Sequence, residues 1–447
     1  MNPAKLPLAD IVERCEHLLR LSPADSTVIS WIESASNLAI ESTRTRRVES
    51  SASRIVVVRV REGRRSGLAR SEASEVGELQ ATLRQALALA RAASISPDWE
   101  WPRAAEEPSP QATLDGLHDD EVAGLAPPAA QQRLQRLADR QSTLRCSWSE
   151  LGLVVAASGR PTRAARATEI SLEARTGRRP GSGFAAASSR TLRDLAFERL
   201  VARAQSLQAS EITEALPDRQ EPAVLAPEAA VALLELVARE VFSGRRFVAG
   251  QGPLADPAER RALSPLVRLV DEPGEVAMLG FPFDYDGLSK RRRELVHEGE
   301  LAGPVLDLEL AARCGRHSTG HGVAGEDATP GHPQWLAGDE SEDDLLRRSA
   351  GGIRIGSIEN LRCLPGPGLP FRGVARSVRR IGEGGRLEAA LPPLIWTGKV
   401  LDLLAAVDGA ARERALWIPA THRSPAVAPA LRLSAVGDLS PSREVRG

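Results

Sequence analysis

The segment ARCGRHSTGHGVAGEDATPGH is the one part of the sequence in which residues of metal-ligating type cluster. Cys314, His317 and His321 follow the spacing C-x2-H-x3-H. Thiolate and imidazole are ordinary zinc ligands, and Glu298 or Glu326 would serve as the general base of a stand-alone metallopeptidase. Ser, Thr and Gly separate the two histidines and are poor helix residues. The competing interpretation is therefore a loop whose histidines hydrogen-bond to the backbone.

The sequence lacks the common motifs for nucleotide binding and for a catalytic serine nucleophile. Gly398-Lys399 is followed by Val400 and lacks the upstream glycine of a phosphate-binding loop. There is no G-x-S-x-G motif, and no G-x-G-x-x-G follows a predicted strand. The acidic run DESEDD at 339–344 predicts a solvated helix start rather than a cation site, because carboxylates favour the positive end of a helix.

Charge and cysteine content narrow the class of protein. Lys plus Arg number 58 and Asp plus Glu 59, so no overall positive field exists to attract nucleic acid or an anionic membrane. The four cysteines lie far apart, which predicts reduced thiols in a cytosol. The first twenty residues carry charges throughout, unlike a signal peptide, and no apolar run approaches the length of a membrane span. We expect a cytoplasmic protein that binds neither nucleic acid nor membrane.

The first half of the sequence predicts an α+β domain. Its helices show apolar residues at i, i+3 and i+4, and its strands are rich in β-branched residues. The predicted helices are 8–19, 75–93, 129–141 and 192–207, and the predicted strands are 27–32, 38–41, 54–61, 144–157, 164–175 and 183–188. A long surface connection is predicted at 99–128. The polar, proline-containing stretch 214–222 predicts a boundary between a domain of residues 1–215 and a domain of residues 222–447.

The second half begins with a helix in LAPEAAVALLELVAREVFSG. Pro227 fits its first turn, Glu228 favours its positive end and Gly244 would end it. Short β-like runs follow at 267–269, 305–308, 353–358, 374–381 and 416–419. Glycine and proline turns separate these runs, which favours a mainly antiparallel, barrel-like C-terminal β domain. The predicted fold class is α+β.

Several segments in a fixed order make the sequence resemble the TldD/PmbA family, also called modulators of DNA gyrase. They are RVREGRRSGLARSE with ALALARAASISPD, then VLAPEAAVALLELV, LVDEPG with GFPFDYDG, GELAGPVLDLELAARCGRHSTGH and GEGGRLEAALPPLIWTGKVLDLL. The resemblance covers most of the chain. It implies an N-terminal α+β domain and a largely antiparallel C-terminal β domain, in agreement with the boundary drawn from composition.

The resemblance also implies a chemistry whose residues this sequence lacks. TldD-like members are metallopeptidases with a His-Glu-x-x-x-His motif on the helix after the domain boundary and a later cysteine ligand, whereas PmbA-like (TldE) members lack these. Arg239, Glu240 and Gly244 stand where His, Glu and His would stand, and Cys363 lies near the region of the cysteine ligand. A guanidinium has no lone pair and glycine has no side chain, so neither binds zinc. No histidine occurs in 119–296, so a shifted register leads to the same conclusion.

The resemblance therefore implies a catalytically silent TldE/PmbA-like subunit with no metal or other cofactor of its own. It would form a heterodimer with a TldD-like subunit that holds zinc, and the complex would degrade or trim unfolded peptides or mature a ribosomally made peptide. This chain would hold an extended peptide by strand addition. Two alternatives stay open: a stand-alone metallopeptidase with zinc at Cys314, His317 and His321, and a non-enzymatic peptide-binding scaffold.

Overall fold

The chain folds into three β-sheets with helices packed around them. The computed structural model describes residues 5–95, 116–257, 263–274, 279–323, 325–419 and 425–442. Six strands from the first half form one sheet, and strands from the second half form a ten-stranded and a four-stranded sheet. Mixed helices and largely antiparallel sheets confirm the predicted α+β class.

The first sheet is fully antiparallel, with the order β3-β2-β1-β4-β5-β6. Its strands are β1 (Ser26–Ser42), β2 (Arg46–Glu62), β3 (Arg65–Ser71), β4 (Thr143–Ala157), β5 (Arg163–Thr176) and β6 (Gly183–Ser189). The sequence predicts two short strands where β1 runs unbroken. The Ser and Asn residues between them stay in the strand because β1 pairs along its length with both β2 and β4.

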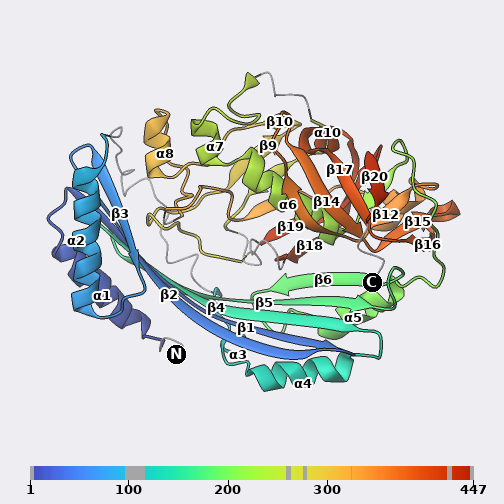
Figure 1. Cartoon of the computed structure of the whole chain (residues 1–447), viewed down its shortest axis with the longest axis horizontal. Coiled ribbons are helices and arrows are strands. Elements are labelled where there is room, and N and C mark those ends of the chain that lie inside the picture. The colour runs from blue at the N-terminus through green and yellow to red at the C-terminus, as the bar shows by residue number, and fades with distance from the viewer. Residues whose placement is uncertain are drawn as a thin grey trace.

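Helices cover the outer face of this sheet. They are α1 (Leu8–Arg20), α2 (Val76–Ala92), α3 (Asp120–Ala123), α4 (Pro127–Leu137) and α5 (Phe197–Ser206). α1 and α2 bury their apolar stripes around Trp31 at one end of the sheet, and α3, α4 and α5 do so around Trp148 at the other end (Figure 1). Most of the predicted connection at 99–128 lies outside the described residues.

The second half of the chain lies on the opposite face of the long, curved sheet (Figure 1). Phe281 and Phe283 pack on Val155 and its neighbours on that face. The hydroxyl of Ser30 in β1 donates a hydrogen bond of 2.7 Å to the carbonyl oxygen of Tyr285. Residues 281–285 therefore hold the second half against the first sheet.

Two open sheets make up the second half. The larger has the order β10-β9-β8-β11-β19-β7-β12-β15-β16 with β18 added to β19, and the smaller has the order β13-β14-β17-β20. Their strands are β7 (Ala223–Leu225), β8 (Leu269–Asp271), β9 (Arg293–His297), β10 (Glu300–Leu301), β11 (Pro333–Trp335), β12 (Ile353–Ile355), β13 (Ser357–Cys363), β14 (Pro370–Arg376), β15 (Val378–Ile381), β16 (Leu387–Leu391), β17 (Leu394–Lys399), β18 (Val407–Trp417), β19 (Ala426–Leu433) and β20 (Asp438–Pro441). Among the described strands neither sheet closes on itself, so the barrel-like arrangement is not found.

Helix α6 (Pro227–Val241) lies at the centre of the second half, where it packs against β19 and β13. Leu233, Leu236 and Val237 are fully buried, as expected for a helix that is apolar on nearly all sides. The other helices are α7 (Gly244–Val248), α8 (Leu308–Arg313), α9 (Glu342–Arg347) and α10 (Val400–Ala405). The strand predicted at 305–308 is wrong: Asp307 caps the N-terminus of α8, accepting a hydrogen bond from Leu310 N. The DESEDD run begins α9 with a capping box, as predicted.

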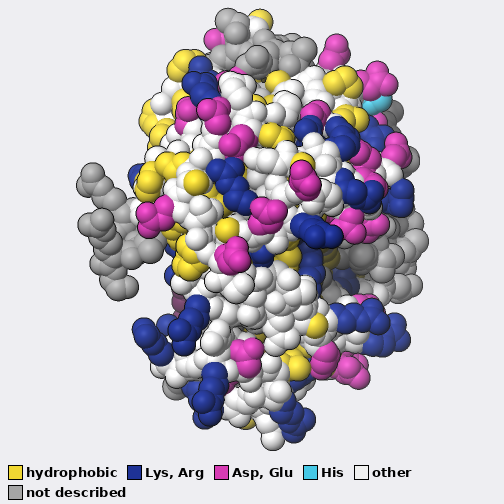
Figure 2. All heavy atoms as spheres, turned by 90° about the vertical axis from the view of Figure 1, so that its right-hand side faces the viewer, with side chains coloured by type: hydrophobic (Ala, Val, Ile, Leu, Met, Phe, Trp, Pro, Cys, Tyr) yellow, Lys and Arg dark blue, Asp and Glu magenta, His cyan; other side chains and the backbone are white. Residues whose placement is uncertain are grey.

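The surface carries charges of both signs. Lys and Arg are interspersed with Asp and Glu over the face that Figure 2 shows. None of the described helices is long and apolar enough to span a membrane. The strands of the first sheet all precede residue 190, and the strands of the other two sheets all follow residue 222. The domain boundary between residues 215 and 222 stays a prediction.

Candidate functional site

The C-terminal end of α6 brings two carboxylates and two guanidiniums together. Arg239 Nη1 lies 3.2 Å from Glu235 Oε1, and Arg239 Nε lies 3.2 Å from Glu240 Oε1. Arg246 of α7 places Nη1 3.4 Å from the second oxygen of Glu240. Glu240 is thus held between two positive charges. Glu235, one turn back on the helix, was missed by the sequence analysis, although it precedes Glu240 by the same five residues that separate the two histidines of the family motif.

Glu240 and Arg246 border an open hollow of about 540 Å³. Its lining comes from α6, α7, the turns after α7 and the end of β13: Glu240, Arg246, Gly250, Gln251, Gly252, Asp256, Cys363, Leu364, Pro365 and Gly366. Cys363 and Glu240 therefore lie on one hollow although they are far apart in the sequence. Burial and the charge of Glu240 raise the pKa of the Cys363 thiol to about 12. The thiol is therefore protonated at neutral pH and is a poor nucleophile.

Gly244 does not have the role that the sequence predicts for it. α6 already ends at Val241, and Gly244 is the first residue of α7. A Cβ at Gly244 would lie 2.3 Å from the carbonyl oxygen of Val305, so the glycine allows a close approach of two backbones. No side chain, and hence no ligand, fits there. A motif running from Arg239 to Gly244 would also be split between two helices.

The alternative zinc ligands Cys314, His317 and His321 do not form a cluster. Cys314 follows α8 and its thiol donates to the carbonyl of Leu310 at 3.2 Å. His317 is exposed, whereas His321 is buried with 1% of its surface accessible. His321 uses Nε2 on Asp271, at 2.9 Å, and Nδ1 on Thr319 Oγ1, also at 2.9 Å. Within the described ranges no three His, Cys, Asp or Glu side chains are grouped so that they could hold a metal.

The helix α6, the hollow and the surrounding sheets all lie within a recognisable domain. Residues 218–437 match the family described as the PmbA/TldA metallopeptidase C-terminal domain. The C-terminal half of this chain belongs to the PmbA/TldD family. No curated protein matches the sequence.

Solved structures show that the similarity of fold extends over nearly the whole chain. TldE from Thermococcus kodakarensis is 19% identical, with a TM-score of 0.75, and the match covers 96% of this chain and 98% of that one. A putative modulator of DNA gyrase from Thermotoga maritima is 17% identical, with a TM-score of 0.78 and coverage of 96% and 99%. Another from Bacteroides thetaiotaomicron is 16% identical, with a TM-score of 0.74 and coverage of 97% and 99%. These likenesses establish the fold and not the activity.

The α6 end of this PmbA/TldD domain does not fit a zinc ion. Zinc sites use thiolate, neutral imidazole or carboxylate ligands, and the two carboxylates here already pair with guanidiniums. The fixed positive charge of Arg239 between them would repel a divalent cation.

A buried polar network, which the sequence analysis did not predict, joins the domain to the first sheet. Burial alone would raise the pKa of Asp271, but the hydrogen bond from His321 and the charge of Lys290 hold it well below its usual range. Burial lowers the pKa of His332 to about 3, so this imidazole is neutral. The family segment GFPFDYDG contributes Asp286, whose carboxylate pairs with Arg59 of β2.

Asp284 of the same segment fixes its shape. Its carboxylate accepts hydrogen bonds from the backbone N–H groups of Asp286, Leu288 and Gly322, at 3.0, 2.8 and 2.8 Å. Burial and the neighbouring charge of Asp286 raise the pKa of Asp284. The network is structural, because backbone amides and buried cations already bind its carboxylates.

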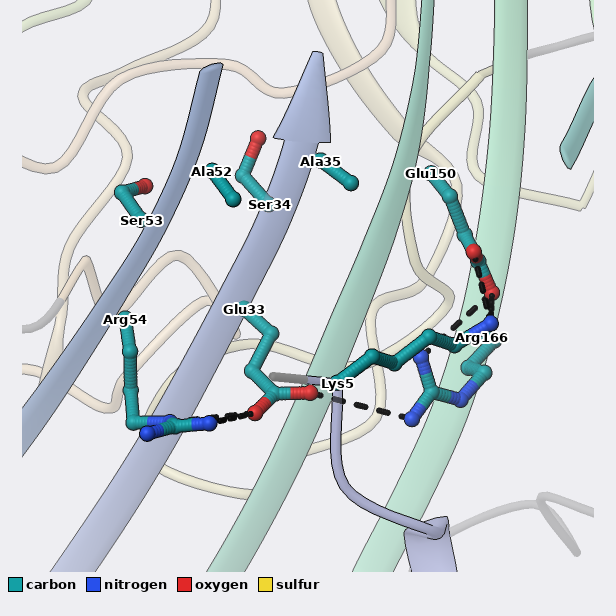
Figure 3. A pocket seen from close by; sticks show the side chains of 9 residues that line it. All are labelled: Lys5, Glu33, Ser34, Ala35, Ala52, Ser53, Arg54, Glu150 and Arg166. Atoms are coloured by element: carbon teal, nitrogen blue, oxygen red, sulfur yellow. Dashed lines mark hydrogen bonds and ion pairs between the residues drawn. The ribbon is translucent and has the colours of Figure 1, made fainter. Parts of the chain in front are cut away.

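A smaller hollow of about 30 Å³ lies on the outer face of the first sheet (Figure 3). Arg54 lies 3.1 Å from Glu33, and Arg166 lies 3.4 Å from Glu150. Lys5 closes the row with a contact of 2.7 Å to Glu150. This volume holds about one or two water molecules, so the row is best described as a partly buried chain of ion pairs that ties residue 5 to the sheet.

Proposed function

We propose that this chain is a catalytically silent, TldE/PmbA-like subunit that forms a heterodimer with a TldD-like zinc metallopeptidase and takes part in degrading or trimming unfolded peptides. The observation that carries the proposal is the position of Arg239 between Glu235 and Glu240. A guanidinium stays positively charged at every physiological pH and offers no lone pair. The end of α6 therefore has an ion-pair network where an active family member would place its metal ligands.

The hollow beside this network supports a role in binding peptide. Its volume lies within the range of about 300–1,000 Å³ typical of ligand pockets. Arg246, Glu240 and Asp256 offer charges of both signs, and Gly250 and Gly252 leave backbone groups accessible. Such a surface suits an extended peptide of little sequence specificity, because backbone hydrogen bonds then supply much of the affinity.

The test is reconstitution from two purified subunits. This chain alone, a TldD-like subunit from the same source alone, and the two together are assayed for hydrolysis of an unstructured peptide and for bound zinc. We expect hydrolysis and zinc to follow the TldD-like subunit, and the two chains to co-elute as a heterodimer. Chelator-sensitive hydrolysis by this chain alone would refute the proposal.

A pair of variants separates a silent site from an active one. Glu240→Gln removes the carboxylate at the general-base position, and Glu13→Gln, on the exposed side of α1, is the matched control. Both reconstituted complexes should keep the activity of the unmodified one. A loss of about a hundredfold with Glu240→Gln only would show that this carboxylate takes part in the reaction.

A further inference from the structure

The first sheet ends in a long strand segment that is paired on one side only. β2 pairs with β1 from Arg46 to Arg61, but β3 covers only Val56 to Glu62 on the other side. Among the residues that the structure describes, nothing pairs with the outer edge of residues 46–55. The backbone N–H and C=O groups of this edge are available to another strand.

The edge carries charged side chains of both signs, but no proline, lysine or bulge. Residues 46–51 are all exposed, and Val48 leaves 44% of its surface accessible. Natural edge strands are commonly guarded by proline, lysine, a bulge or a covering loop. The segment RRVESSAS contains no proline or lysine, and its pairing with β1 runs without a register shift.

We propose that this edge pairs with the same edge of a second copy of the chain, antiparallel, around a twofold axis at Val48. The sequence around Val48 is self-complementary in charge: Arg47 and Glu49 flank it, so Arg47 of each copy would oppose Glu49 of the other. Opposite charges directly across an antiparallel pair stabilise it, and the twofold axis supplies two such pairs. Within one chain the two side chains already pair, while 58% and 44% of their surfaces stay accessible.

The two faces of the strand fit this arrangement. Val48 is the cross-strand partner of Ala39, which belongs to the apolar cluster under α4, so Val48 points to the α4 side. Its contact with the Val48 of the second copy would bury both side chains beside that helix. Arg47 and Glu49 lie on the opposite, concave face, so both ion pairs would form there. The edge belongs to the first sheet, whereas α6 lies in the second half (Figure 1) and borders the hollow, so this inference does not depend on the proposed function.

Charge reversal tests both the dimer and its register. Sedimentation equilibrium of the full chain should show a monomer–dimer equilibrium. Arg47→Glu or Glu49→Arg alone places like charges opposite each other twice and should weaken dimerisation about tenfold or more. The double variant Arg47→Glu with Glu49→Arg exchanges the two charges and should restore the wild-type dissociation constant.

Matched charge reversals far from the edge serve as controls. Glu13→Arg and Arg20→Glu change the net charge equally at exposed positions of α1 and should leave the dimer unchanged. Circular dichroism and melting temperature confirm that each variant is folded. A wild-type chain that is monomeric throughout the concentration range would overturn the proposal. A dimer that is indifferent to the single reversals, or not restored by the double variant, would overturn the assigned edge and register.

Discussion

Replacing Glu235 by glutamine should make the second half of the chain more stable at neutral pH. Only 4% of the Glu235 surface is accessible, and burial raises the pKa of its carboxyl from the ordinary 4.5 to about 7. Arg239 opposes this change and Glu240 adds to it. The folded chain therefore holds the proton more tightly than the unfolded chain does. The contribution of Glu235 to wild-type stability must therefore fall as the pH rises from about 4.5 to about 7.

The structure sets the size of this effect. One pKa unit corresponds to about 1.4 kcal/mol, so a displacement from 4.5 to about 7 amounts to about 3 kcal/mol at most. Glutamine keeps the shape of the neutral acid and does not titrate. The difference in unfolding free energy between variant and wild type should grow in favour of the variant by up to about 3 kcal/mol between pH 4.5 and pH 8.

The assay is thermal and urea unfolding of both proteins at half-unit steps of pH. For a domain of this size about 3 kcal/mol corresponds to about 6–12 °C in melting temperature. Glu13→Gln, at an exposed position of α1, corrects for the loss of one carboxylate. The ion pair with Arg239 forms only with the ionised carboxylate, so its loss is already contained in the pKa of Glu235 and adds no separate term. A difference that stays flat with pH, or grows in favour of the wild type, would refute the raised pKa of Glu235.

Three further substitutions test the packing of the chain by urea unfolding. Gly183→Ala places a Cβ 1.9 Å from a carbonyl oxygen in α5 and should destabilise the folded chain by about 2–3 kcal/mol. Gly77→Ala is the control, because open space surrounds Gly77, and it should not destabilise the chain. Equal effects of the two substitutions would contradict the close approach at Gly183. Arg59→Met leaves the buried carboxylate of Asp286 without its cation and should cost about 3–5 kcal/mol, and a loss below about 1 kcal/mol would show that this pair does not join the two halves. Trp396→Ala empties a fully buried position and should cost about 3–5 kcal/mol, with a loss under about 1 kcal/mol excluding a tightly packed site.

The candidate site shows what motif spacing alone can and cannot predict. The chemistry of Arg239 was accessible from the sequence, and the family resemblance placed Cys363 near the region of the family's cysteine ligand. The role of Gly244 was not, because its reason is the backbone of Val305, some sixty residues later. Glu235 carried a usable signal, its five-residue distance to Glu240, but only the folded helix shows that Arg239 connects the two.

Local pattern predicted most elements of the fold, and errors arose where a partner strand overrides propensity. α6 is apolar on all sides and was predicted within three residues of its observed end. The gap predicted within β1 is absent, because pairing with β2 and β4 compensates for the low strand propensity of Ser and Asn. The β-branched Val305 favours a strand at residues 305–308. The side chain of Asp307 instead caps the N-terminus of α8, so no strand forms there.

The sequence by itself determined the residue types: which positions can bind a metal, which stretches can be helices or strands, and how the charges balance. These properties belong to single side chains and to periodicities of two and 3.6 residues, so they need no folded chain. Only the tertiary structure decided which side chains meet. Burial beside distant partners raises the pKa of Glu235 and Cys363 and gives Asp271 its ion-paired state, because desolvation and neighbouring charge depend on contacts between segments far apart in the sequence.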